Sequence, residues 1–391
     1  MFMRYIISFF IITLFSCSEK TGDIRSGYFS NVQFSLDTVI IDPGINIIFL
    51  EYDLLNADKS IDDKYLFNFN MDDHSLEKIN LNTLRLEEKL PFEKEGPNGT
   101  GPSFGGLKIR NENQFTIGGM NRTELFSLNG EKLKTIRYDS FFLESNPSVA
   151  GEFVSPITFL EEESNRLYVL IDQKANKSYA FGILHLDNYE IIRMPLKTFE
   201  DLYDYGFTFF MGQSSIGFGP GKGIDMFGTK LVLSNQITSA LMVYDTEMDS
   251  LYTKDYCSKL IADKKVRPYQ LEHETEESLE AEYSRFHQEI NFLAPFWDEK
   301  NQVFYRFAYQ EMPSESKEDV QIKSKIYLTV LDKDLNLIGE TLVPQLTKKP
   351  AKPFSRQFPK HFAKDGKIWI YENINDEMGF AVLTISKKEI G

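Results

Sequence analysis

Short stretches of alternating apolar and polar residues, separated by turn residues, fill the chain from Val32 onward. The clearest group contains four such stretches, at residues 106–109, 114–118, 123–128 and 131–138. An alternation of period two is typical of half-buried β-strands, and the Asn129-Gly130 pair between the last two stretches is typical of a tight hairpin turn. This pattern predicts a unit of four sequential antiparallel strands.

The same order of strands recurs along the chain with different residues. Further groups of four are expected within residues 45–91, where the first strand is placed at 45–52, and within 157–196, 223–256 and 295–343. A last group has only three strands, within residues 361–385, whereas residues 32–41 form a strand without a partner. Pairing these two segments would close a ring and remove the exposed sheet edges. The sequence therefore predicts an all-β, six-bladed β-propeller closed by residues 32–41.

One helix is expected between the strands, around residues 276–293. Apolar residues there recur at helical spacing, namely Leu279, Tyr283, Phe286, Ile290 and Leu293. Thr275 is a suitable N-cap, and Pro295 bars continuation. We expect this helix to dock on the propeller; recognition of a partner through an exposed apolar stripe is the alternative.

Connections of unequal length predict two different faces. Because strands alternate in direction within each unit, turns after the first and third strands lie on one face, and the other connections lie on the opposite face. The connections on this second face are long, at residues 93–105, 139–155, 197–222, 258–294 and 344–360. Long ordered loops are where binding and catalysis usually occur, so we expect the functional site at the mouth of the channel on this face.

The N-terminus has the features of a lipoprotein signal. Arg4 precedes an apolar run, and Leu14-Phe15-Ser16-Cys17 matches the pattern that a lipoprotein signal peptidase cleaves before cysteine. We expect residues 1–16 to be a signal peptide, Cys17 to be lipidated, residues 17–31 to be a flexible tether and residues 32–391 to form the propeller. An ordinary signal peptide with an incidental cysteine is the alternative.

Charge limits the partners of the protein. The net charge is −15, and no basic stripe interrupts it, so nucleic acid is excluded as a partner. Attachment to a membrane must come from the lipid on Cys17, and an envelope protein or a glycan is the expected further partner. Cys257, the other cysteine, is expected to be a buried, inert thiol.

Six residues are candidates for ligand binding. Lys222 follows a glycine-rich stretch near the channel, and Arg306 is the one charge in an apolar strand, where we favour an internal ion pair over an anionic ligand. Asp172, Asn235 and Asn373 end equivalent second strands and are read first as caps of the following turns; a cluster of the three at the channel mouth is the functional alternative. His361 completes the set at the channel mouth.

Motifs of catalysis and cofactor binding are not found. The five histidines lack metal-ligand spacing, the glycine-rich stretches are not phosphate loops, and no G-x-S-x-G motif is present. We therefore expect no metal site and no cofactor.

The mature chain resembles the uncharacterised six-bladed propeller lipoproteins of Bacteroidetes, and its strand rhythm is similar to NHL and TolB-like repeats. This resemblance rests on three features: the cleavage pattern of residues 14–17, the alternation of strands and turns in residues 107–138, and the stretches of glycine and proline before first strands. It implies a propeller in the cell envelope and no known activity. We expect a non-enzymatic, lipid-anchored binding or scaffolding module. The alternative is a hydrolase or lyase that acts on envelope or dietary polysaccharide, with its site at the channel mouth among Lys222, Arg306 and His361.

Overall fold

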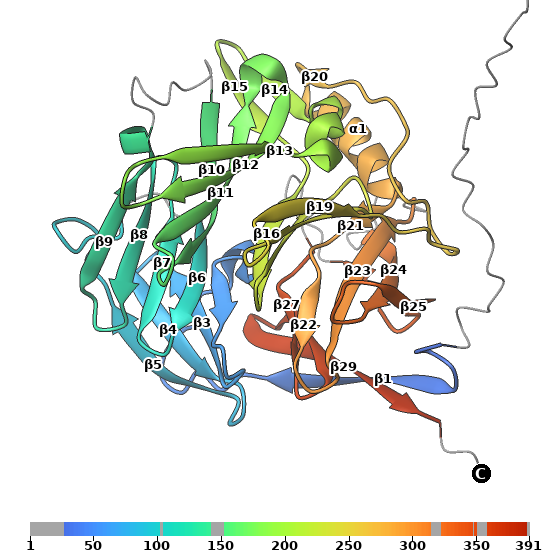
Figure 1. Ribbon diagram of the computed structural model, residues 1–391. Coiled ribbons are helices and arrows are strands. Elements are labelled where there is room, and N and C mark those ends of the chain that lie inside the picture. Colours follow the sequence, from blue (N-terminus) through green and yellow to red (C-terminus); the bar gives the residue numbers. More distant parts are fainter. Residues whose placement is uncertain are drawn as a thin grey trace, which may run out of the picture.

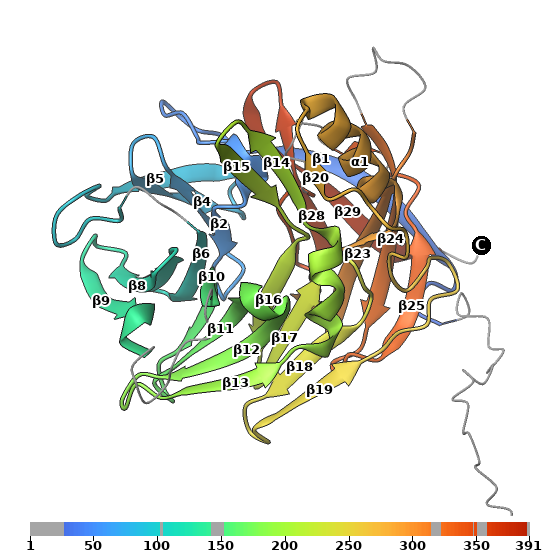
Figure 2. The ribbon, with the colours of Figure 1, turned by 90° about the horizontal axis from the view of Figure 1, so that it is seen from above.

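The computed structural model describes residues 27–101, 105–141, 152–313, 322–346 and 358–388, and the backbone of residues 348–349. These residues form an all-β fold of mostly four-stranded antiparallel sheets, to which one α-helix is added (Figure 1). Viewed from above, the sheets follow one another in chain order around a common centre (Figure 2). The predicted all-β class is therefore correct, and so is the prediction that the sheets are built mainly from strands that are consecutive in the chain.

Four sheets each contain four consecutive strands. They are β2 to β5 (Ala57–Lys59, Tyr65–Asn70, Ser75–Asn80, Arg85–Pro91), β6 to β9 (Gly106–Asn111, Gln114–Gly118, Arg122–Ser127, Lys132–Arg137), β10 to β13 (Glu152–Glu161, Arg166–Gln173, Ser178–His185, Ile191–Pro195) and β16 to β19 (Lys222–Phe227, Lys230–Asn235, Leu241–Asp245, Ser250–Lys254).

A fifth sheet is extended by two short strands. Its main strands are β22 to β25 (Phe296–Asp298, Val303–Glu311, Ile322–Leu331, Leu337–Leu342), and β21 (Asn291–Phe292) and β26 (Lys348–Lys349) add to them. Strand β21 pairs with the same strand, β23, as β22 does.

The sixth sheet joins the two ends of the chain. Strands β27 (His361–Lys364), β28 (Lys367–Ile374) and β29 (Glu377–Lys387) are followed in space by β1 (Val32–Ile40), which is the outermost strand. Strand β1 runs antiparallel to β29 from the pair Val32 and Lys387 to the pair Ile40 and Gly379. The predicted pairing of the N-terminal strand with the last three strands is confirmed.

Apolar side chains fill the spaces between consecutive sheets. Phe67 and Phe69 of β3 pack with Phe115 and Phe126 of the next sheet, and similar clusters join each sheet to the following one. The last sheet packs against the first, where Trp369 and Phe380 share a cluster with Leu66 and Ile79. Each of these six sheets therefore buries apolar side chains against the sheet on either side of it.

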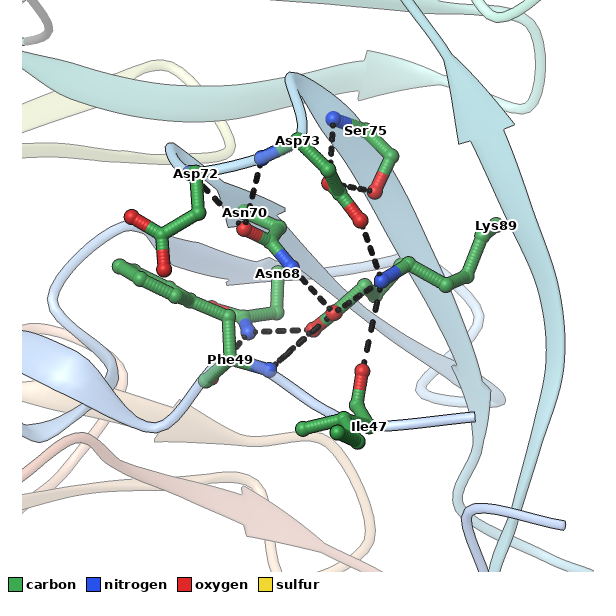
Figure 3. A network of polar contacts seen from close by, with 9 residues as sticks. Ile47, Phe49, Asn68, Asn70, Asp72, Asp73, Ser75 and Lys89 are labelled. Atoms are coloured by element: carbon green, nitrogen blue, oxygen red, sulfur yellow. Dashed lines mark hydrogen bonds and ion pairs between the residues drawn. The ribbon is translucent and has the colours of Figure 1, made fainter. Parts of the chain in front are cut away.

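The expected strand at residues 45–52 is wrong. This segment is a loop followed by a 3-10 turn, Glu51–Leu54, and the first strand of the sheet is β2. The N–H of Phe49 donates to both carboxylate oxygens of Glu77 at 3.1 Å, and its carbonyl accepts from Asn68 Nδ2 at 2.7 Å (Figure 3). Side chains thus satisfy the backbone groups that a strand would use in a ladder.

Helix α1 spans Glu276–Gln288 and is shorter than expected. The Thr275 hydroxyl accepts from Ser278 N at 3.2 Å, as expected of the N-cap. The chain leaves the helix after Gln288 because it joins β21, so Leu293 lies beyond the helix. Leu279 and Phe286 are buried in the cluster that joins two sheets, so the exposed apolar stripe of the alternative hypothesis is not present.

A small sheet inside the long connections was not expected. The chain after β13 forms a 3-10 segment, Lys197–Tyr205, and then the hairpin of β14 (Phe207–Met211) and β15 (Ser214–Phe218). Strand β20 (Glu272–His273) pairs with β14 in parallel, close to helix α1. Strands β14, β15 and β20 lie at one end of the molecule, near α1 (Figure 1).

Two further expectations concern the chain before β1 and Cys257. Tyr28 and Phe29, which fall within the expected tether, pack on the cluster around Phe307. Cys257 is exposed, so the prediction of a buried thiol is wrong. Residues 1–16 and Cys17 lie outside the described residues. Within the described part, no helix has the length and apolar character needed to cross a membrane.

Candidate functional site

A cavity of about 590 Å³ lies at the centre of the sheets. The first strands of four sheets contribute Ala57, Lys108, Ile157 and Lys222, and the segments before β22 and β27 contribute Ala294 and Lys360. Gly106 and Lys222 begin their strands, and Asn235 ends the second strand of its sheet. The cavity therefore lies at the end of the sheets where the long connections emerge.

The two walls of the cavity differ in chemistry. One wall is aromatic: Tyr283 comes from helix α1, Phe292 and Tyr309 from the sheet that contains β21 and β23, and Phe358 from the segment before β27. The opposite wall consists mainly of small residues at β6, β7 and β10. A Cβ atom at Gly118 would lie 1.9 Å from the carbonyl oxygen of Pro156, so glycine is required there for close approach of the two sheets. A flat ligand could thus rest on rings on one side and on backbone on the other.

Two ion pairs join different sheets beside the cavity. Lys108 of β6 pairs with Asp225 of β16, and Lys360 Nζ lies 3.6 Å from Asp58 Oδ1 of β2. Burial would lower the pKa of Lys108, but the carboxylates of Asp225 and Asp58 outweigh it and raise this pKa. Burial lowers the pKa of Lys360, against the opposing effect of Asp58.

Lys222 stands apart from these pairs. Its Nζ donates to Pro220 O at 3.4 Å and lies 5.2 Å from the centre of the Tyr179 ring. Burial lowers the pKa of Lys222, and the charge of Asp172 opposes this effect. Asp172 itself accepts a hydrogen bond from the Tyr203 hydroxyl. Lys222 therefore offers a cation at the cavity wall that its surroundings only partly compensate.

Gln236 fixes the glycine-rich loop that precedes Lys222. The side-chain oxygen of Gln236 accepts from Gly221 N at 2.8 Å, and the backbone N–H of Gln236 donates to Gly221 O at 2.9 Å. Its Nε2 donates to Asn291 Oδ1 at 3.0 Å. The loop at residues 219–221 is thereby held against β21, which positions Lys222 without help from a ligand.

Of the six candidate residues, two line the cavity, Lys222 and Asn235. Asn235 Oδ1 accepts from Ile237 N at 3.0 Å and Thr238 N at 3.2 Å, and Asn373 Oδ1 accepts from Asp376 N at 2.9 Å. Both asparagines therefore cap the turns after their strands, as expected. Asp172 binds Tyr203 beside the cavity, so the three equivalent positions do not form one cluster.

The expected ion pair of Arg306 is wrong. Its guanidinium donates to three carbonyl oxygens: to Leu293 at 2.7 Å, to Thr238 at 3.3 Å and to Ser239. The side chain is 4% exposed, and burial lowers its pKa to about 10. Carbonyl dipoles replace a carboxylate here, and Arg306 ties β23 to the turn after β17 instead of facing the central cavity.

His361 belongs to an aromatic cluster. Its ring centre lies 5.0 Å from that of Phe296, 5.4 Å from Phe307 and 5.2 Å from Phe358. Nδ1 lies 2.9 Å from Pro359 O, and burial lowers the pKa of His361 to about 4. The imidazole is therefore neutral near pH 7 and packs as a core group, and Lys222, Arg306 and His361 do not converge on one point.

A comparison with protein families identifies the chain. The model of a domain of unknown function, DUF4221, matches residues 27–342. The chain belongs to the DUF4221 family. The crystal structure of a DUF4221 member from Bacteroides vulgatus has a TM-score of 0.63 to this structure at 16% identity, and the match covers 91% of this chain and 99% of that one.

A second solved structure is more distant. A Bacteroides fragilis protein that is proposed to be exported has a TM-score of 0.48 at 10% identity, over 93% of this chain and 97% of that one. Curated proteins provide no match. The likeness to the Bacteroides vulgatus DUF4221 structure supports the fold.

Sequence reasoning missed most of the cavity of this DUF4221 protein. Lys108 and Lys360 were not singled out, because the carboxylates that pair with them lie on other sheets, far away in the sequence. Gln236 and Tyr309 gave no local pattern. One signal was available: Lys108 is a charge at the centre of the first strand of the clearest four-stranded group. Among the described residues, no three His, Cys, Asp or Glu side chains come together as metal ligands would.

Proposed function

We propose that the six four-stranded units form a closed six-bladed β-propeller, and that the protein is a lipid-anchored binding module of the cell envelope. The observation that carries this proposal is the cavity of about 590 Å³ to which all six units contribute. Its size is that of a typical small-ligand pocket, and its position where first strands converge is where a propeller has its channel.

Packing around the whole circuit supports the closed ring. Six apolar clusters join neighbouring sheets, including the last with the first. Strand β1 supplies the outer strand of the last unit, so the two ends of the chain share one blade. Such a ring is rigid and can present a preformed cavity to a ligand.

Binding is favoured over the hydrolase or lyase that the sequence left as the alternative. A glycosidase needs two carboxyl groups that face the substrate. The described residues that line the cavity include no Asp or Glu, and the nearby Asp58 and Asp225 are engaged with lysines. The cavity therefore has features that hold a ligand and lacks a pair of acids that would cleave it.

Filling the cavity tests the binding function. A side chain at Gly219 would begin near Lys222 Nζ, with only that atom at 4.0 Å, so Gly219→Leu should fold and reduce the space. Gly217→Leu on β15, where nothing lies within 4 Å, is the matched control. A panel of neutral and acidic mono- and disaccharides, followed by saturation-transfer NMR, should give at least one ligand for the wild type and for Gly217→Leu that Gly219→Leu loses. Absence of any ligand, or equal binding by all three proteins, would reject the proposal.

The lipid anchor is tested separately, through Cys17. We expect Cys17→Ala to move the protein from the membrane pellet to the soluble fraction of the cells that make it, because the acyl chains supply the attachment. Unchanged fractionation would remove the anchor from the proposal and leave the cavity unaffected.

A further inference from the structure

We propose that the ligand of the central cavity is an acidic saccharide, whose carboxylate pairs with the ammonium group of Lys222 while its ring lies on the aromatic wall. This inference rests on the proposed binding function and names the chemical class of the ligand. Charge, the type of donor and the two unlike walls support it independently.

The charged side chains that line the cavity are opposite in sign to the net charge of the protein. The net charge of the chain is −15, yet the charged side chains among the described lining residues are all lysines: Lys108, Lys222 and Lys360. An acidic protein that gathers cations in a central cavity favours entry of an anion there.

Lys222 is the lysine that can receive an anion. Lys108 and Lys360 already pair with Asp225 and Asp58. Around Lys222, the described side chains place no carboxylate oxygen within 4.0 Å, and the contacts of its Nζ are one carbonyl at 3.4 Å and the Tyr179 ring at 5.2 Å. A partly buried ammonium with so few partners gains strongly from a carboxylate.

Asp172 does not fill this role. Its carboxylate accepts from the Tyr203 hydroxyl. Burial raises the pKa of Tyr179, and the charge and hydrogen bonding of Asp172 raise it further. The two tyrosine rings lie 5.4 Å apart and occupy the space on that side of Lys222. Asp172 thus moderates the charge of Lys222 from a distance and leaves its free side toward the cavity.

The donors favour a carboxylate over a phosphate. A doubly charged phosphate is usually held by an arginine fork, by several lysines or by a nest of backbone N–H groups. Arg306 does not line the cavity and donates to carbonyl oxygens, and Gly221 N, at the cavity wall, donates to Gln236. One available ammonium matches a singly charged carboxylate.

The two walls favour a saccharide ring as the rest of the ligand. A pyranose has an apolar C–H face that packs on aromatic rings and hydroxyl groups at its edge that need polar partners. The wall of Tyr283, Phe292 and Tyr309 offers the rings, and Ser234 and Thr116 offer hydroxyl groups. A purely apolar acid would leave these polar groups unpaired, at a cost of about 1–3 kcal/mol for each buried group.

The experiment compares acidic and neutral sugars on charge variants. Glucuronate, galacturonate and N-acetylneuraminate are the acidic probes; glucose and galactose are the neutral probes; glucose 6-phosphate is the phosphate probe. Binding is measured by calorimetry and saturation-transfer NMR with the folded full-length protein, for the wild type, Lys222→Gln and Lys222→Arg. Lys333→Gln makes the same charge change on an exposed turn and is the control.

We expect at least one acidic probe to bind the wild type and Lys333→Gln with equal affinity. The same probe should bind Lys222→Gln roughly tenfold more weakly, and Lys222→Arg should recover part of this lost affinity. Added salt should weaken the same interaction. Failure of all three acidic probes, equal binding by Lys222→Gln, or tighter binding of the phosphate probe would overturn the inference. If neutral sugars bind and Gly219→Leu abolishes this binding while Lys222→Gln does not, the acidic ligand is wrong and the binding function stands.

Discussion

Glu77 shows how one buried carboxylate can shape a loop far away in the sequence. Its side chain is fully buried on β4 and accepts from Phe49 N, Asn68 Nδ2 and Asn70 Nδ2, and Lys89 Nζ lies 3.3 Å away (Figure 3). Lys89 also donates to Asp73 at 2.6 Å. These bonds hold the loop before β2 against the first sheet, close to where Leu55 and Ala57 line the cavity.

The first prediction concerns this network. Glu77→Gln should lower the free energy of unfolding by about 1–3 kcal/mol, because an amide N–H would face donors that need an acceptor. Denaturant unfolding measures the change, and Glu88→Gln, an exposed carboxylate on β5, is the control. Equal stability of Glu77→Gln and the wild type would show that the network does not hold the loop.

The same residue predicts a dependence on pH. Burial raises the pKa of Glu77 above its ordinary value of 4.5, although the hydrogen bonds of Asn68 and Asn70 oppose the shift. The folded state therefore holds the proton more tightly than the unfolded state, so this contribution to stability is present below pH 4.5 and is lost as pH rises through the folded-state pKa. The destabilisation by Glu77→Gln should be larger at pH 4 than at pH 7, and the opposite order would contradict the shift.

His361 predicts the opposite slope. Its pKa is lowered from 6.5 to about 4 by burial, so the folded state binds this proton less tightly than the unfolded state. Stability from this group is present above pH 6.5 and is lost as pH falls toward 4. His361→Leu should reduce the loss of stability on acidification between these values. An NMR titration of the imidazole with a midpoint near 6.5 would contradict the prediction.

Among the secondary-structure elements, helix α1 acts as a brace between the small β14 sheet and the wall of the cavity. The Phe286 ring lies 5.8 Å from Phe207 of β14 and 5.8 Å from Tyr269, and Lys265 Nζ donates to the Phe286 carbonyl at 2.6 Å in the last turn of the helix. A cation at this end also interacts favourably with the helix dipole. The helix thereby connects the small β14 sheet to the wall of the cavity.

Truncation in this helix should destabilise the whole fold. We expect Phe286→Ala to cost about 3–5 kcal/mol, because the ring fills the core between two sheets, and Thr275→Ala to cost about 1 kcal/mol as a lost N-cap. Thermal and denaturant unfolding give the two values. If Phe286→Ala left the global stability unchanged, the helix would be a peripheral attachment and not a brace.

Strands and helices could be predicted from the sequence where the local pattern of residues determines them. The four strands of residues 106–138 and the start of helix α1 follow from alternation, turn residues and a capping threonine. Residues 45–52 were mistaken for a strand because Glu77, on another strand, satisfies the backbone of Phe49. The hairpin of β14 and β15 lies within a long connection, where its apolar residues gave no sign of a partner strand.

Strand β1 decides the integrity of the whole molecule. It pairs with β29 along its full length, and Ile41, which follows it, is fully buried between the last and first sheets. This long-range pairing could be predicted because the last group lacked one strand. The site could not be predicted to the same extent, because its lysines, rings and polar groups come from segments that meet only when all the sheets are in place.

A strand supplied in trans tests this arrangement. A chain that begins at residue 42 should lose cooperative thermal unfolding, because Ile41 is absent from the core and β29 becomes an open edge. A synthetic peptide of residues 27–41 should restore the transition, and a chain that begins at residue 27 is the control. Cooperative unfolding of the shorter chain without the peptide would show that the last sheet is stable with three strands.

The pairing of β1 with β29 also brings the two ends of the described chain together, since Lys388 N donates to Asn31 O at 2.6 Å. The described part of the chain therefore begins and ends at nearly the same place. A short linker could join residue 388 to residue 27, and the chain could be opened at the exposed turn of Asp187 and Asn188. Such a circular permutant would keep every sheet and the cavity while moving its ends, and with them any attached tag or lipid, to the face opposite the cavity mouth.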